Sequence, residues 1–179
     1  MVMPVVDKAT HIGVTRSQNN SAQSTVEENL KKTRRAIYSL MGTGLHGENG
    51  LDPETSIALL RTYILPILTY GLEIVIPKGK ILTIYNSNKK LLKQILSLNI
   101  NVADPAVYLI SGLLPIEAEI HLKILTMFGN ITRANKKSSE WRLAERQLQI
   151  KSMDSNSWFI DMKKICIKYD LEKPIITTL

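Results

Sequence analysis

The chain has 179 residues, of which 44% are hydrophobic and 22% are charged, so it has enough apolar side chains to build a core and is not disordered as a whole. Its formal net charge of +7 is compatible with a polyanionic partner, although ordinary soluble domains also reach such values. No stretch approaches the roughly 18 uninterrupted apolar residues of a membrane span, and the N-terminus lacks a secretory-signal pattern. We therefore expect no membrane partner.

Cysteine and histidine usage argues against a metal site. The single cysteine, Cys166, excludes an internal disulfide and a cysteine-based zinc finger, and we expect it to be a small buried side chain in an intracellular protein, nuclear or cytoplasmic. His11, His46 and His121 lie far apart, without a second ligand at a suitable spacing. We predict neither a metal nor a cofactor.

The chain opens with β-branched residues in 2–14, which predict one or two short strands, followed by a polar linker, 18–24. Ser24 and Glu27 have the spacing of a capping box and predict the start of a long helix, which Gly42 and Gly44 should end. The apolar face of this predicted helix consists of Val26, Leu30, Ile37, Leu40 and Met41.

A second helix is predicted to start at Asp52 and Pro53, because Asp is a good N-cap and Pro suits the first helical position. Its apolar residues nearly surround the axis, which indicates a buried helix, and Pro66 should kink or end it near Leu65. Glu73 follows in an apolar stretch, as a partly buried acid paired with a base or as a surface residue.

The third predicted helix covers 80–98, with apolar residues at three- and four-residue steps and lysines on its other faces. Asp104 and Pro105 repeat the cap pattern before a short helix that runs through Ile110. Another helix should follow Pro115, and its apolar stripe consists of Ile116, Ile120, Ile124 and Phe128.

A polar linker at 135–139 predicts a boundary before two more helices, at 139–151 and 158–169. The predicted fold class is mainly α: an irregular helical bundle with a short N-terminal β-ribbon. The predicted domains are a ribbon in 1–17, a helical region in 18–134 and a C-terminal helical extension in 135–179.

Catalytic patterns are missing from the sequence. There is no Walker loop, dinucleotide-binding glycine pattern or His-Glu-x-x-His motif. The glycines of 42–50 follow a predicted helix rather than a strand, so an ordinary loop is favoured over a phosphate site. Glu27 and Glu28 belong to a helix's first turn, where carboxylates suit the helix dipole, and Glu117 and Glu119 point to different faces of one helix.

The basic residues carry the remaining functional signal. The candidate phosphate-binding side chains are Lys31, Lys32, Arg34 and Arg35 on the first helix and Lys89, Lys90 and Lys93 on the third. The alternative interpretation is that each group is an ordinary solvated helix face. Lys136 and Lys137, in the polar linker, are interpreted as solubilising residues.

Several segments together resemble a known family. They are 10–14, 30–40, 61–73, 88–98 and 109–115, and the most specific runs from Tyr63 to Glu73 as Tyr-x-Leu-Pro-x-Leu-x-Tyr-Gly-x-Glu. They are similar to the region just downstream of the catalytic palm in reverse transcriptases of non-LTR retrotransposons, above all the jockey-like branch. The resemblance covers 10–131 and continues more weakly through 157–159.

The resemblance implies that 2–14 is the last ribbon of a palm whose other strands are missing, and that the helices within 24–98 are a thumb that holds a template–primer duplex. The family's metal-binding aspartates belong to a Tyr-x-Asp-Asp turn upstream, and this sequence has no Asp-Asp pair. It also lacks the endonuclease domain and a downstream Cys/His knuckle. We therefore do not expect this chain alone to be an RNA-directed DNA polymerase.

The expected residual role is non-specific binding to the backbone of duplex DNA, RNA or an RNA–DNA hybrid. The missing palm region is a further expected partner. The alternative is a non-catalytic helical interaction or scaffold module without a nucleic-acid role. A third reading is an active transferase whose palm comes from another chain.

Overall fold

The structure, a computed structural model, describes residues 7–17, 21–45, 50–81 and 89–171. Contacts divide the chain into two compact units, 1–119 and 120–179, and each is described by itself. The predicted mainly α fold with a short N-terminal β-ribbon is confirmed. The domain division predicted from the sequence stays a prediction, and the central part of the predicted helix 80–98 lies outside the described residues.

The ribbon is an antiparallel hairpin of β1 (Lys8–His11) and β2 (Val14–Ser17). Its two turn residues, Ile12 and Gly13, both have positive φ, 48° and 74°, as the tight turns between antiparallel strands require. Such a φ is costly for a β-branched residue. The Tyr70 hydroxyl donates a hydrogen bond to the Ile12 carbonyl at 2.8 Å, which holds the turn in this conformation.

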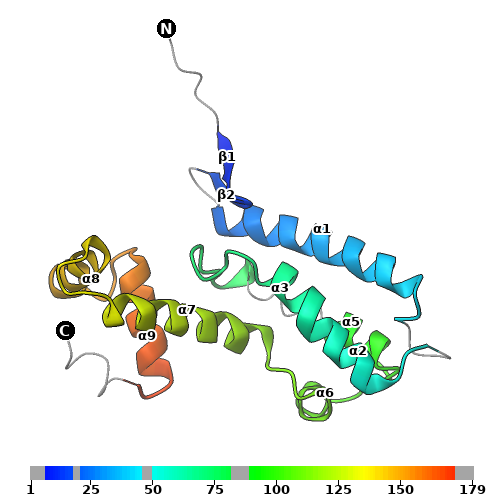
Figure 1. Ribbon diagram of the computed structural model, residues 1–179. Coiled ribbons are helices and arrows are strands. Elements are labelled where there is room, and N and C mark those ends of the chain that lie inside the picture. Colours follow the sequence, from blue (N-terminus) through cyan, green and yellow to red (C-terminus); the bar gives the residue numbers. More distant parts are fainter. Residues whose placement is uncertain (1–6, 18–20, 46–49, 82–88, 172–179) are drawn as a thin grey trace, which may run out of the picture. The chain divides into compact units, whose positions relative to one another are not determined.

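The hairpin rests on α1 (Ser21–Met41), and Figure 1 shows β2 at the N-terminal end of this helix. Hydroxyl groups of α1 bind the outer edge of β2: Thr25 Oγ1 donates to the Thr15 carbonyl at 3.1 Å, and Ser21 Oγ bonds to both backbone groups of Ser17 at 2.9 Å. The predicted start of the helix at Ser24 is wrong. The helix already includes Ser21, three residues earlier, whose Oγ bonds to the end of β2.

The predicted apolar face of α1 is confirmed where Val26, Leu30 and Ile37 are buried, and the helix ends at Met41, just before the predicted glycines. Three polar residues share the buried face and were not predicted to: Thr25, Asn29 and Thr33.

The second helix is continuous but not uniform. It comprises α2 (Pro53–Leu59), a π-helical turn η1 (Leu60–Ile64) and α3 (Leu65–Leu68). The Asp52 cap is confirmed, since its side chain accepts from the Thr55 backbone N–H at 2.9 Å. Pro66 was predicted to kink or end the helix near Leu65, and the helix does not end there but is irregular, with the π-helical turn just before Leu65. Its hydrogen bonding shifts by one residue, and Pro66 then stands in the first turn of α3, where a missing N–H is tolerated.

The core of the first unit lies between α1, the α2–α3 helix, α5 (Lys89–Ile95) and α6 (Asp104–Ser111). The buried cluster at its centre consists of Ile37, Leu45, Leu60, Ile64 and Ile95. α6 ends at Gly112, which has a φ of 60°, and the Gly112 carbonyl accepts from Arg61 Nη2 at 3.1 Å.

The helix α7 (Ile116–Arg133) starts in the first unit and continues into the second, which also holds α8 (Ser139–Ile150) and α9 (Trp158–Lys168). All three helices fall where the sequence predicted them. The predicted α7 stripe of Ile116, Ile120, Ile124 and Phe128 is buried throughout. Cys166 is buried, as predicted, with its Sγ 3.3 Å from Met162 Sδ. Among the described helices, none is long and apolar enough to cross a membrane.

Candidate nucleic-acid interface

The four predicted cations of α1 are all exposed. Arg34 and Arg35 lie three and four residues after Lys31, so the three side chains form one stripe, with Lys32 beside it. Ile37, at the centre of the buried face, lies on the opposite side of the helix. The sequence therefore places these cations correctly: α1 turns its basic face away from the core. We call Lys31, Lys32, Arg34 and Arg35 the α1 basic face.

Within the described parts of the chain, no ion pair or hydrogen bond engages the side chains of the α1 basic face. The acids one turn before Lys31 are Glu27 and Glu28. The Glu27 carboxylate accepts a hydrogen bond from Gln23 Nε2 at 2.9 Å, and no ion pair joins either acid to the α1 basic face among the described residues. The ammonium and guanidinium groups of this face are therefore available to an external anion.

Tyr38 extends the same stripe, since it lies three and four residues beyond Arg35 and Arg34. Its side chain is 69% exposed. An aromatic ring next to cations suits a nucleic acid, because it can stack on a base or a sugar while the cations bind phosphates. Tyr38 was not among the predicted site residues, although its spacing from Arg34 and Arg35 is a sufficient signal.

The lysines of α5 are placed differently. Lys93 is buried, and its Nζ lies 2.9 Å from Asp104 Oδ1 and donates to the Ile100 carbonyl at 3.0 Å. Lys89 Nζ bonds to the other carboxylate oxygen of Asp104. Lys90 is exposed to solvent, and the side chain of Lys89 is 39% exposed. One carboxylate thus engages two of the three α5 cations.

Asp104 is not the helix cap that its position before Pro105 predicted. The N-cap of α6 is Ala103, and Asp104 is the first helical residue, without a capping bond. Its carboxylate is turned to α5 instead. Hydrogen bonds from Lys89 and then Lys93 lower the pKa of the Asp104 carboxyl below its ordinary value, and the bond to Asp104 raises the pKa of Lys89. Tyr108, one turn further, has a raised pKa because it is partly buried and faces the Asp104 charge.

The α1 and α5 cations do not form one surface. Ile37 of α1 and Ile95 of α5 belong to the same buried cluster, so α5 lies on the core side of α1. The α1 basic face is on the opposite side of that helix. A single groove lined by all seven predicted cations is therefore absent, and the α1 basic face is the surface that remains.

The segment from Tyr63 to Glu73 is the most specific part of the resemblance, and in this fold it contacts α1 and the hairpin. Tyr70 holds the hairpin turn, and Asn29 Nδ2 donates to the Leu68 and Tyr70 carbonyls at 3.2 and 2.8 Å. Gly71 has a φ of 70°, and a Cβ atom there would lie 2.6 Å from Val14. These residues join the second helix to α1 and the hairpin, and they bring no reactive group together.

Glu73, for which the sequence left two readings open, is half-buried. No group of three or more His, Cys, Asp or Glu side chains arranged as metal ligands is found in the part of the chain that the structure describes. His46 lies outside that part. The α1 basic face is thus the candidate site with a recognisable ligand chemistry.

Comparisons of the chain with protein-family models, with curated proteins and with solved structures gave no match.

Proposed function

We propose that the chain is a thumb-like region of a reverse transcriptase of the non-LTR retrotransposon type, without the catalytic palm, and that its residual function is sequence-independent binding to the nucleic-acid backbone. The observation that supports binding is the α1 basic face: four exposed cations without a described partner, continued by the exposed ring of Tyr38. Phosphate contacts of this kind position a protein on a duplex without reading its bases.

The expected binding is weak and depends on salt. Lys31 and Tyr38 are about 10 Å apart along the helix axis by the rise of roughly 1.5 Å per residue, so we expect about three to four phosphate contacts. The slope of log affinity against log salt is then about −3 to −3.5, at roughly 0.9 per contact. The two engaged α5 lysines are left out of this number. Dissociation constants of about 10⁻⁴ to 10⁻⁶ M are usual for such binding at physiological salt.

The test compares two variants that remove the same charge. The first replaces Lys31, Lys32, Arg34 and Arg35 by Ala; the control replaces Lys137, Arg142, Arg146 and Lys151, four exposed cations of the second unit, by Ala. Fluorescence anisotropy with a labelled RNA–DNA hybrid and a duplex DNA, between 50 and 200 mM KCl, gives the affinity and the slope. We expect the first variant to lose affinity for both duplexes alike and to flatten the slope, whereas the control stays close to the parent.

Equal losses in both variants would show attraction to net charge alone, and an unchanged slope in the first variant would refute the α1 basic face as the site. A Tyr38→Ala variant refines the result. If the ring stacks, its loss lowers the affinity without changing the salt slope, because no counterion is released.

The proposal includes no polymerase activity for this chain alone, since the sequence has no Asp-Asp pair to hold two metal ions at a primer end. A primer-extension assay with template, nucleotides and magnesium should stay at background. Extension that depends on magnesium and persists through purification would contradict this part.

The alternative function, a helical interaction module, is favoured by three exposed apolar side chains at the end of α6 and after it: Leu109, Ile110 and Leu114, at 85%, 64% and 47% exposure. Contiguous exposed apolar groups mark contact surfaces. A double variant, Leu109→Glu with Ile110→Glu, separates the two functions, because it should leave nucleic-acid binding through α1 intact.

A further inference from the structure

A pocket in the first unit is lined by side chains of α1, the α2–α3 helix, α5 and α6. Among its lining residues are Thr33, Ile37, Leu65, Leu92 and Tyr108. The lining is almost wholly apolar, and the volume is about 80 Å³. The pocket lies on the core side of α1 and shares no residue with the α1 basic face. Its chemistry is therefore separate from the proposed nucleic-acid binding.

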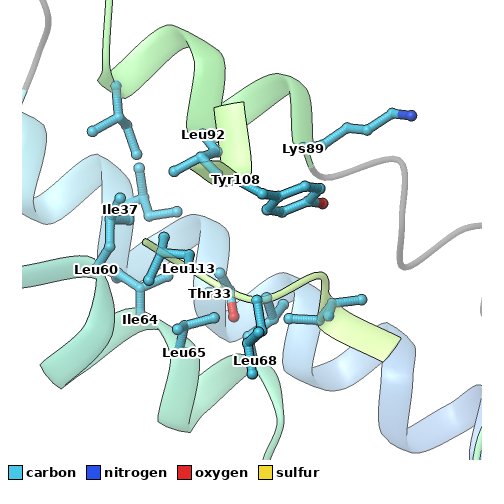
Figure 2. A pocket seen from close by; sticks show the side chains of 13 residues that line it. Thr33, Ile37, Leu60, Ile64, Leu65, Leu68, Lys89, Leu92, Tyr108 and Leu113 are labelled. Carbon is cyan, nitrogen blue, oxygen red and sulfur yellow. The ribbon is translucent and has the colours of Figure 1, made fainter. Parts of the chain in front are cut away.

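Thr33 brings an unpartnered polar atom to this apolar lining. Its side chain is 4% exposed, and its hydroxyl has no hydrogen-bond partner among the residues that the structure describes. Figure 2 shows Thr33 between the side chains of Leu65, Leu68 and Leu113. A buried hydroxyl without a partner loses its hydration and gains nothing in return. A ligand in the pocket can supply the missing bond.

Thr25, eight residues earlier on the same helix, provides the contrast. It is also buried, but its hydroxyl donates to the Thr15 carbonyl. The buried hydroxyl of Thr25 thus has a hydrogen-bond partner within the protein, whereas the buried hydroxyl of Thr33 has none among the described residues. The difference places the open hydrogen-bonding position at the pocket.

The other polar groups of the pocket direct no charge into it. Figure 2 shows Tyr108 across from Thr33, and the Lys89 side chain directed away from the apolar residues. Lys89 is bonded to Asp104, which Lys93 also engages, and its ammonium is held away from the apolar lining. An apolar lining disfavours an ionised group. The pocket therefore suits a neutral ligand.

We propose that this pocket binds a small neutral molecule with a compact apolar body and one hydroxyl or carbonyl group, which hydrogen-bonds to Thr33. The size of the pocket limits the size of the body: an apolar cavity of about 150 Å³ holds benzene, so a pocket of about 80 Å³ takes a body no larger than a single ring.

The test uses phenol as the probe and toluene, which has the same ring and no hydroxyl, as its control. Both are titrated into the full chain, and the methyl NMR signals of Ile37 and Ile64 report on the pocket. We expect phenol to bind about 3- to 10-fold more tightly than toluene, the factor that one net hydrogen bond gives. In Thr33→Val, which keeps the shape and removes the hydroxyl, the two affinities should become equal. Leu92→Phe, which fills the pocket, should weaken both.

The unpartnered state of Thr33 has a separate readout. The urea midpoint should fall in Thr25→Val, which breaks the bond to Thr15, and should not fall in Thr33→Val. A lower midpoint in both variants would show that Thr33 already has a partner and would overturn the proposal. It is also overturned if phenol leaves the methyl signals unchanged, or if the preference for phenol survives in Thr33→Val.

Discussion

α1 and α5 carry similar runs of basic residues and both contribute to one buried cluster, yet the surroundings of their charged groups differ. The α1 basic face is exposed without a described partner, whereas Lys93 and Lys89 share the Asp104 carboxylate. A single acid later in the chain thus engages two of the three α5 lysines. Counting charges along a sequence cannot show this, because the pairing depends on the tertiary contact between α5 and α6.

The comparison is tested most strongly at Lys93. Lys93→Ala removes the bonds to Asp104 and to the Ile100 carbonyl, and we expect it to lower the free energy of unfolding by about 1–3 kcal/mol. Lys90→Ala, at the exposed neighbour, is the matched control and should change this free energy by less than about 0.5 kcal/mol. Urea unfolding followed by circular dichroism measures both, and equal effects would show that the buried position of Lys93 has no energetic consequence.

A smaller effect, with a defined pH dependence, is expected at Asp104. Its pKa is lower in the folded chain than in the unfolded one, so its contribution to stability is present above the ordinary carboxyl pKa and is lost as the pH falls through the lowered value. Asp104→Asn should therefore be less stable than the parent near pH 7. The two stabilities should converge in acid, as unfolding midpoints measured from pH 7 to pH 2 would reveal. A difference that stays constant across this range would contradict the ion-pair assignment.

The smallest effect is expected on α1, and it has the opposite sign. Arg35 lies one turn after Lys31, and like charges at this spacing destabilise a helix by about 0.2–0.5 kcal/mol. Arg35→Ala should therefore raise the thermal midpoint slightly at low salt, and the gain should vanish at high salt. A loss of stability at low salt would mean that Arg35 has an attractive partner, and the α1 basic face would then be less available to phosphates.

Local patterns predicted much of the helical architecture. The three- and four-residue spacing of Ile116, Ile120, Ile124 and Phe128 identified the buried face of α7, and Asp52 followed by Pro53 marked the start of α2. These features depend on residues a few positions apart, which is the range over which helix periodicity and capping act.

The features that sequence reasoning missed depend on distant residues. Asp104 has the same local pattern as Asp52, but the lysines of α5 compete for its carboxylate. Ser21, the first residue of α1, bonds to the end of β2. At the candidate site, the exposure of Lys31, Lys32, Arg34 and Arg35 followed from their position off the apolar stripe. The burial of Lys93 did not follow, since it required the position of α6.

The bonds of Asn29 and Tyr70 also bear on the order in which the chain folds. Tyr70 reaches Ile12 across 58 residues of sequence, and Asn29 reaches Tyr70 across 41. Helices form from neighbouring residues within about a microsecond, whereas contacts of such separation require closure of a long loop and carry its entropic cost. We therefore expect the hairpin to dock after the helices have formed. Val14 of the hairpin lies so close to Gly71 that the hairpin fits only when the turn after α3 already has its final conformation. We therefore expect the formation of this turn to precede the docking of the hairpin and the completion of the first unit.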